Sequence, residues 1–235
     1  MNLLVLQPDY RSLMGSLFVW PRRSVVFTAD PADLPRREVN IADALGEWWA
    51  LAQASTSVGG LDAVAVRVPF GGDVFPAPAA YTPEVRGRLE TLSAHSPLHL
   101  PAALAAVDAC LDLFGDIPII LVFETAFFAD LPEREQLYGL KAGLGSTLGP
   151  RRYGYHGLYH EAACRWAARR LRRHPGPSGL IRTLSICLEP RPEAAAVVGR
   201  RPVMVTGGAT PLEGLPGETT CGELDPSIVL TLAEK

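Results

Sequence analysis

Short apolar runs alternate with longer amphipathic stretches along the first half of the chain. Leu3–Leu6 and Ser16–Trp20 have the length and apolar composition of strands, and Ser24–Thr28 is a candidate third strand. Ala63–Val68 and Ile117–Phe123 are nearly continuous apolar runs rich in Ile and Val, which is typical of strands buried on both faces. This alternation predicts an α/β protein.

The helices of the first half are indicated by periodicity and capping residues. Ile41–Ala52 repeats apolar residues at the spacing of one helical face. Thr82-Pro83 offers a hydroxyl cap followed by proline at the first helical position, which predicts a helix to about Ala94. A further helix is expected over Pro101–Leu113.

A cluster of glycines between 139 and 150 separates these elements from a second patterned region. Beyond it we expect two helices, one strand and a hairpin. These are the helices Glu161–Arg173, with a basic outer face, and Ser227–Glu234, the strand Thr183–Leu188, and the hairpin of Ala194–Val198 with Val203–Thr206.

Composition narrows the class of protein. With 235 residues, 48% of them hydrophobic, the chain can bury one large or two modest cores. A formal charge of -3 argues against a nucleic-acid binder. The four cysteines form no Cys-x-x-Cys pair, and Met1–Leu6 lacks a basic leader, so we expect a cytoplasmic protein that does not enter the membrane.

Two motifs carry a family resemblance. Arg151–His160 reads RRYGYHGLYH and Thr210–Gly214 reads TPLEG. Shorter segments support them, namely Ser96–Pro101, Val122–Phe127, Cys221–Pro226, and Arg67 followed by Gly71-Gly72. In this order the segments resemble those of acetate and propionate kinases, in the actin and sugar-kinase superfamily.

The resemblance implies an actin-like, ribonuclease H-like α/β architecture. Residues 1–145 would form a complete acetokinase-like first domain, and residues 146–235 part of the second. The family reaction is ATP-dependent phosphorylation of acetate or another short carboxylate to an acyl phosphate. ATP and Mg²⁺ are therefore expected from the resemblance alone.

Three residues are candidates for the chemistry. The resemblance assigns Arg67 to a carboxylate or phosphate, His156 to the transferring phosphoryl group, and Glu124 to Mg²⁺, where the family has aspartate. Arginine offers a bidentate fork, and imidazole can stabilise developing charge. The alternatives are that Arg67 pairs with a nearby acid, that His156 is structural, and that Glu124 caps neighbouring N–H groups.

A second set of residues aligns with the substrate pocket of the family. Pro69, Leu98, Tyr155 and Pro211 correspond to the apolar wall that holds the short acyl chain, and His99 falls beside them. For His99, and for His160 at a predicted helix start, packing and hydrogen bonding are an equal alternative.

The chain departs from the family pattern around the phosphates. The first phosphate loop is replaced by Gln7–Met14, in which Asp9 adds a negative charge. The second is Cys187–Arg191, which has lost both glycines and gained Pro190. Thr220 stands where the family has a second catalytic arginine, a type of residue whose loss costs orders of magnitude in rate.

These departures favour a pseudoenzyme of the acetokinase family, weak or inactive alone, that acts as a binding or regulatory module or as one half of a complex. The alternative is an active carboxylate kinase with a remodelled site using Arg11, Arg191 or Arg200. A third hypothesis is hydrolysis of acyl phosphates by His156 and Arg67. We expect the ligand to be a carboxylate or phosphate. We also expect a homo-oligomer or a complex with another chain, the alternative being that the chain covers its hydrophobic core with its own residues.

Overall fold

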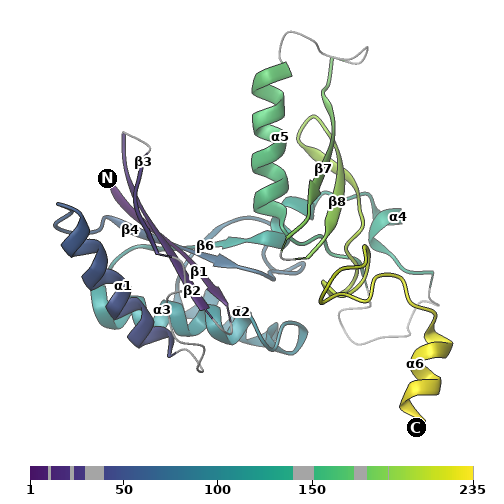
Figure 1. Ribbon diagram of the computed structural model, residues 1–235, viewed down its shortest axis with the longest axis horizontal. Helices are drawn as coiled ribbons and strands as arrows, with labels where there is room; N and C mark the ends of the chain where they lie inside the picture. The colour runs from purple at the N-terminus through teal and green to yellow at the C-terminus, as the bar shows by residue number, and fades with distance from the viewer. Residues whose placement is uncertain are drawn as a thin grey trace. The chain divides into compact units, whose positions relative to one another are not determined.

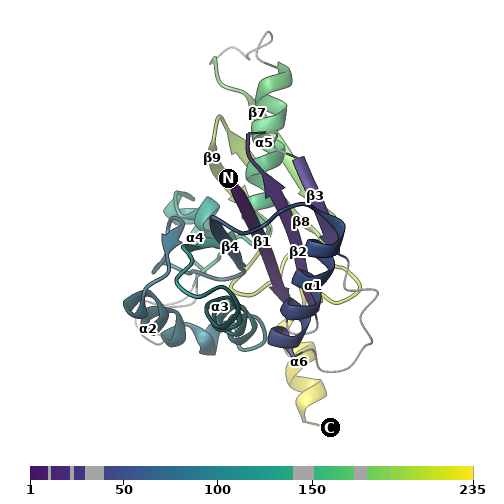
Figure 2. The same ribbon diagram turned by 90° about the vertical axis from the view of Figure 1, so that its left-hand side faces the viewer.

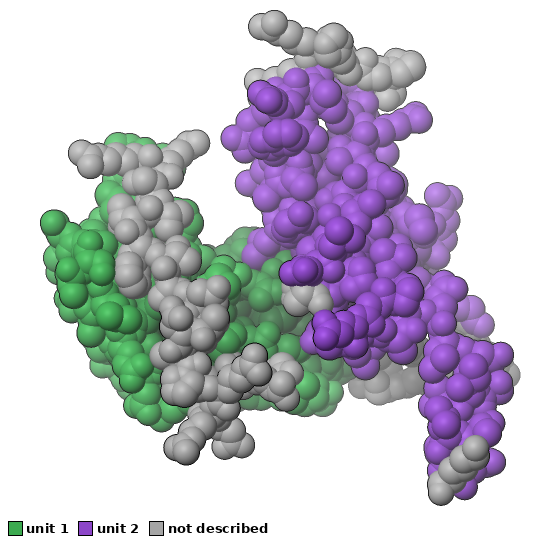
Figure 3. Space-filling view, viewed as in Figure 1, with its two compact units in different colours: residues 1–124 green, residues 125–235 purple. Residues whose placement is uncertain are grey.

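The computed structural model describes residues 1–9, 12–21, 24–29, 40–139, 151–171, 179–189 and 191–234. The chain divides into two compact units, Met1–Glu124 and Thr125–Lys235 (Figure 3). The domain boundary expected after residue 145 falls within 140–150, outside the described residues. Arg11 and Pro190, both named in the sequence interpretation, lie outside them too.

The first unit is built on a six-stranded mixed sheet in the order β3-β2-β1-β4-β6-β5 (Figure 1). Strands β1, β4 and β6 are parallel, whereas β1 with β2, β2 with β3, and β5 with β6 are antiparallel. The strands are β1 (Asn2–Asp9), β2 (Ser12–Val19), β3 (Ser24–Ala29), β4 (Ala63–Val68), β5 (Ala79–Ala80) and β6 (Ile119–Phe123).

Alternating burial explains why β1 and β2 extend beyond the predicted apolar runs. Leu4 and Leu6 of β1 and Leu13 and Leu17 of β2 are buried, while the residues between them are only partly covered. A strand with one buried face needs an apolar residue only at every second position. The polar residues Gln7, Asp9 and Ser12 therefore continue the ladder, although they interrupt an apolar run.

Helices α1 (Ile41–Ser55) and α3 (Leu100–Phe114) pack on each other and against this sheet (Figure 2). Helix α2 (Pro83–Thr91) begins as the sequence predicts, because the Thr82 hydroxyl accepts the Val85 N–H at 3.2 Å. It ends before Ala94, and a 3₁₀ turn, η2 (Ser93–His95), follows.

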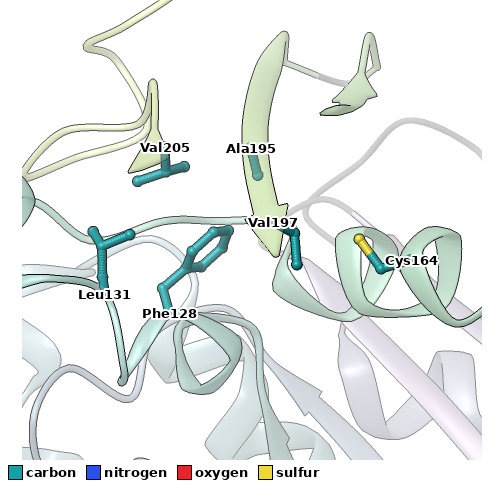
Figure 4. Packing of buried hydrophobic residues seen from close by; sticks show 6 residues of the cluster. All are labelled: Phe128, Leu131, Cys164, Ala195, Val197 and Val205. Atoms are coloured by element: carbon teal, nitrogen blue, oxygen red, sulfur yellow. The ribbon is translucent and has the colours of Figure 1, made fainter. Parts of the chain in front are cut away.

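The second unit contains a three-stranded antiparallel sheet of β7 (Arg182–Cys187), β8 (Glu193–Val198) and β9 (Arg201–Val205). Helix α5 (Gly157–Leu171) packs against β7 (Figure 1). The core between helix and sheet is apolar and consists of Phe128, Leu131, Cys164, Ala195, Val197 and Val205 (Figure 4).

The remaining elements of the structure are short. The 3₁₀ helix η3 (Glu124–Phe128) links the units, and α4 (Glu133–Gln136) follows it. Helix α6 (Pro226–Ala233) is capped by the Asp225 carboxylate, which accepts the Ser227 N–H at 2.9 Å. None of the helices in the described ranges combines the length and the apolar character needed to cross a membrane.

Candidate functional site

The carboxyl ends of the parallel strands place Arg67 and Glu124 side by side. Arg67 pairs in register with Val122 of β6, and Glu124 follows the last residue of that strand. The Arg67 Nε donates a hydrogen bond to Glu124 Oε1. Ligands of open α/β sheets commonly bind at this edge, so the position of the pair is one where a small anion could be recognised.

Burial makes the two members of this pair unequal. The side chain of Glu124 is only 6% exposed, whereas that of Arg67 is 25% exposed. A buried carboxylate is costly without a partner, and the guanidinium provides one. Arginine carries five N–H donors, so further donors remain for a carboxylate or phosphate. Arg67 thus pairs with an acid, as the alternative interpretation stated, and its anion-binding role stays a prediction.

Asp9 and His99 meet at the carboxyl end of β1. Their Oδ1 and Nδ1 atoms are 3.5 Å apart, and the His99 side chain is 16% exposed. Leu98, just before it, is 56% exposed, and Pro69 is half-buried. The pocket roles expected for Pro69, Leu98 and His99 remain predictions. A carboxylate beside His99 makes this part of the edge less favourable for an anion.

The two family motifs meet in the second unit. Glu213 of the second motif binds Arg152 of the first, with Oε1 and Nη2 3.1 Å apart. Glu213 Oε2 also accepts a hydrogen bond from the Tyr138 hydroxyl, which in turn accepts the Ala209 N–H at 2.7 Å. Burial and the hydrogen bond to Glu213 raise the Tyr138 pKa to about 12. The two motifs therefore meet in one polar cluster of Arg152, Tyr138 and Glu213.

Tyr155 and His156 lie in the loop before α5. The Tyr155 hydroxyl donates to the Ala209 carbonyl at 2.7 Å, and its side chain is almost wholly buried. Burial raises the Tyr155 pKa well above its usual range. His156 has a φ of 54°, in the left-handed region that non-glycine residues rarely adopt. The roles expected for Tyr155, His156 and Pro211 toward substrate stay predictions.

Three buried polar side chains behind this loop contact one another. The sequence interpretation did not predict this network. Glu193 Oε2 accepts the Tyr155 N–H at 2.9 Å, and Glu193 Oε1 lies 3.2 Å from His160 Nε2. His160 Nδ1 lies 2.8 Å from Ser185 Oγ. The available signal was an acidic residue at the head of the otherwise apolar strand EAAAVV. His160 is wholly buried, in agreement with its packing alternative.

At two of the replaced family positions, Thr220 and Cys187 form hydrogen bonds to carbonyl groups of the chain itself. Thr220 is buried, and its hydroxyl donates to the Leu215 carbonyl at 3.1 Å. The Cys187 thiol donates to the Glu189 carbonyl, and Glu189 is exposed. Neither Thr220 nor Cys187 brings positive charge, which a transferring phosphoryl group requires.

Whether the described residues could bind a magnesium ion depends on Glu124 and its neighbours. Across the described ranges, no three His, Cys, Asp or Glu side chains gather closely enough to hold a metal ion. One oxygen of Glu124 also accepts a hydrogen bond from Arg67. The described residues do not form a magnesium site by themselves, so the metal role of Glu124 stays a prediction.

A cleft of about 440 Å³ lies at the opposite, amino ends of β4 and β6. It is lined by Trp49, Phe114, Asp62 and Asp116, among others, and it includes none of the expected site residues. The cleft is therefore separate from the Arg67–Glu124 edge of the same sheet.

Comparison with known proteins gives consistent matches. A family model described as the acetokinase family matches residues 30–235. The acetate kinase of Clavibacter michiganensis subsp. michiganensis is 38% identical over 203 residues, which cover 84% of this chain and 50% of that protein. The acetate kinase of Clostridioides difficile is 38% identical over 178 residues, or 74% of this chain and 43% of that one.

Solved structures show the same fold. The Porphyromonas gingivalis acetate kinase matches with a TM-score of 0.83 and 27% identity, covering 99% of this chain and 64% of its own. A propionate kinase from Francisella tularensis matches with a TM-score of 0.84 at 21% identity, covering 100% of this chain and 64% of its own. The chain thus spans about half the length of the curated relatives and has the actin-like α/β fold. It belongs to the acetokinase family.

Proposed function

We propose that this chain binds a short carboxylate or its acyl phosphate at the Arg67–Glu124 edge, in keeping with the acetokinase reaction. In that reaction a carboxylate oxygen attacks the terminal phosphorus of ATP, and the bond to the ADP oxygen breaks. The observation that carries the proposal is a partly exposed guanidinium held by a buried carboxylate at the carboxyl ends of two parallel strands. The pairing orients Arg67 before an anion arrives, and such preorganisation favours binding.

For the second unit we propose, from the family resemblance, that His156 contacts the transferring phosphoryl group and that Tyr155 contacts the substrate. The left-handed backbone at His156 is a strained conformation, and such strain concentrates at functional sites. An imidazole there would donate to a phosphoryl oxygen. Pro69, Leu98 and His99 of the first unit, and Pro211 of the second, keep as proposals the substrate contacts that the family resemblance gives to each of them.

We further propose that the isolated chain transfers phosphate poorly or not at all. Asp9 adds negative charge where relatives are expected to hold phosphate, and Thr220 supplies none of the positive charge of an arginine. Charge of the wrong sign beside a phosphate raises the barrier, because catalysis of this transfer consists mainly of positioning and electrostatic stabilisation. The chain would then act as a binding or regulatory module, or as one part of a complex.

A partner chain is supported by apolar side chains on the surface of the second unit. Leu184 and Ile186 of β7 and Met204 of β9 are exposed, as are Ile228 and Leu230 of α6. Leu184 and Met204 both pair with Ala196 and therefore lie on the same face of the sheet, and exposed apolar faces commonly mark an interface. Light scattering at micromolar concentration tests self-association, and a pull-down from the native cell extract tests a different partner. A monomer that captures no protein would contradict the proposal.

Titration calorimetry tests the binding proposal. Purified protein is titrated separately with acetate, acetyl phosphate and Mg-ATP. We expect acetyl phosphate to bind and Arg67→Ala to weaken that binding about tenfold or more, the loss expected of a charge-assisted hydrogen bond. Arg88→Ala is the matched control, since Arg88 lies in the same unit but contacts the Val74 carbonyl and the Phe75 ring. Acetyl phosphate binding that Arg67→Ala leaves unchanged would remove the proposal.

A further inference from the structure

A buried carboxylate, that of Glu193, accepts a hydrogen bond from the loop that carries His156. Glu193 heads strand β8, and its side chain is only 5% exposed. One of its oxygens accepts the Tyr155 N–H at 2.9 Å, directly before His156. The carboxylate thus holds the Gly154–Tyr155 peptide group, one residue before the strained His156.

The position of Glu193 is in turn fixed by two neighbours on its other side. Its second oxygen lies 3.2 Å from His160 Nε2, and His160 Nδ1 lies 2.8 Å from Ser185 Oγ. His160 sits in the first turn of α5, where its N–H reaches back to the His156 carbonyl at 3.0 Å. Glu193 of the sheet is therefore connected to His156 in two ways. One is its hydrogen bond to the Tyr155 N–H, and the other is its contact with His160, whose N–H binds the His156 carbonyl.

Close packing leaves the carboxylate little freedom to move. A Cβ atom on Gly207 would lie 2.4 Å from Glu193 Oε2, so a larger residue at 207 would displace this oxygen. Residues that share a dense polar network hold one rotamer more firmly than an isolated pair does.

We propose that Glu193 is a positioning residue, which keeps His156 in the left-handed conformation by accepting the Tyr155 N–H while His160 and Ser185 hold the carboxylate. A left-handed histidine is costly relative to the ordinary helical or extended state. Without the hydrogen bond from the Tyr155 N–H to Glu193, the loop relaxes and His156 leaves the left-handed conformation. The consequence for anion binding rests on the proposed function, whereas the backbone conformation does not.

The test uses Glu193→Gln and a matched control. Glutamine keeps the size of the side chain but replaces one of the two oxygens with an NH₂ donor. Because Tyr155 and His160 contact different oxygens, one of the two contacts loses its acceptor. Thr206→Val is the control, because the Thr206 hydroxyl also accepts a backbone N–H in this unit, that of Ala194 at 3.0 Å. NMR scalar couplings report the φ of His156, and calorimetry reports the affinity for inorganic phosphate.

We expect Glu193→Gln to abolish the positive φ of His156 and to weaken phosphate binding about tenfold, the cost of restoring the left-handed state on binding. Thr206→Val should keep the positive φ and change the affinity less than about twofold, as expected away from the site. Retention of the positive φ in Glu193→Gln would overturn the inference. Absence of phosphate binding by the unaltered chain would instead count against the proposed function, and the φ measurement would still decide the inference.

A milder variant covers the case in which Glu193→Gln does not fold. Ser185→Ala removes only the partner of His160 Nδ1 and leaves the carboxylate in place. We expect a partial loss of the positive φ at His156 and a fall in phosphate affinity of about threefold, in line with one neutral hydrogen bond. A His156 φ identical to that of the unaltered chain would again overturn the inference.

Discussion

The Arg67–Glu124 pair predicts an asymmetry between two single substitutions. Arg67→Ala leaves Glu124, 6% exposed, without its guanidinium partner, and removing one member of a buried pair costs about 3–5 kcal/mol. Because Arg67 itself is 25% exposed, water screens the pair, and we expect a loss at or below the lower end of this range, about 2–3 kcal/mol. Glu124→Gln leaves a guanidinium that water can reach, so we expect a loss of only about 1 kcal/mol.

Urea unfolding at neutral pH, followed by tryptophan fluorescence, measures both losses. The double variant Arg67→Met with Glu124→Gln should recover much of the stability, since replacing both charges removes the desolvation cost. Arg134→Ala is the control, because the Arg134 side chain is 83% exposed, and it should change the unfolding free energy by less than about 0.5 kcal/mol. Equal losses for Arg67→Ala and Glu124→Gln would refute the argument that burial of Glu124 dominates the pair.

Three further outcomes can be checked separately. Gly15→Ala should lower the unfolding free energy by about 1–3 kcal/mol in urea, because the new Cβ would lie 2.5 Å from the Trp48 ring. The Tyr138 pKa is raised from 10.0 to about 12, so the unfolding free energy should fall as pH rises from about 10 to 12, and less steeply in Tyr138→Phe. Burial raises the Cys110 pKa to about 12, so mass spectrometry after thiol labelling at pH 8 should find exposed Cys221 modified in the folded chain and Cys110 only after unfolding.

Elements specified by neighbouring residues could be predicted from the sequence. Strand β4 has the bounds expected for its apolar run, Ala63–Val68, and α2 begins at the expected cap, Thr82. Local signals suffice there, because strand composition and helix capping depend on residues within a few positions. Helix α5 begins one turn before the predicted Glu161, since His156 turns the chain and accepts the first helical N–H.

Contacts between distant positions could not be predicted from the residues alone. Glu124 lies 57 positions from Arg67, and Glu193 lies 38 from Tyr155. The resemblance marked Arg67 and His156 but gave no reason to connect Glu193 with His156. That connection depends on the packing of α5 against β7 and the pairing of β7 with β8, which bring an acid at a strand end next to the loop before α5.

A coupled assay of ATP:acetate phosphotransfer by the purified chain tests the central claim most directly. With acetate, ATP and Mg²⁺ supplied, we expect no turnover above the rate without protein, because Asp9 and Thr220 replace attraction for phosphate with repulsion or neutrality. Turnover in the ordinary enzyme range of about 1–1,000 per second would contradict the account. It would show instead that the chain is an active short-chain carboxylate kinase with a remodelled site.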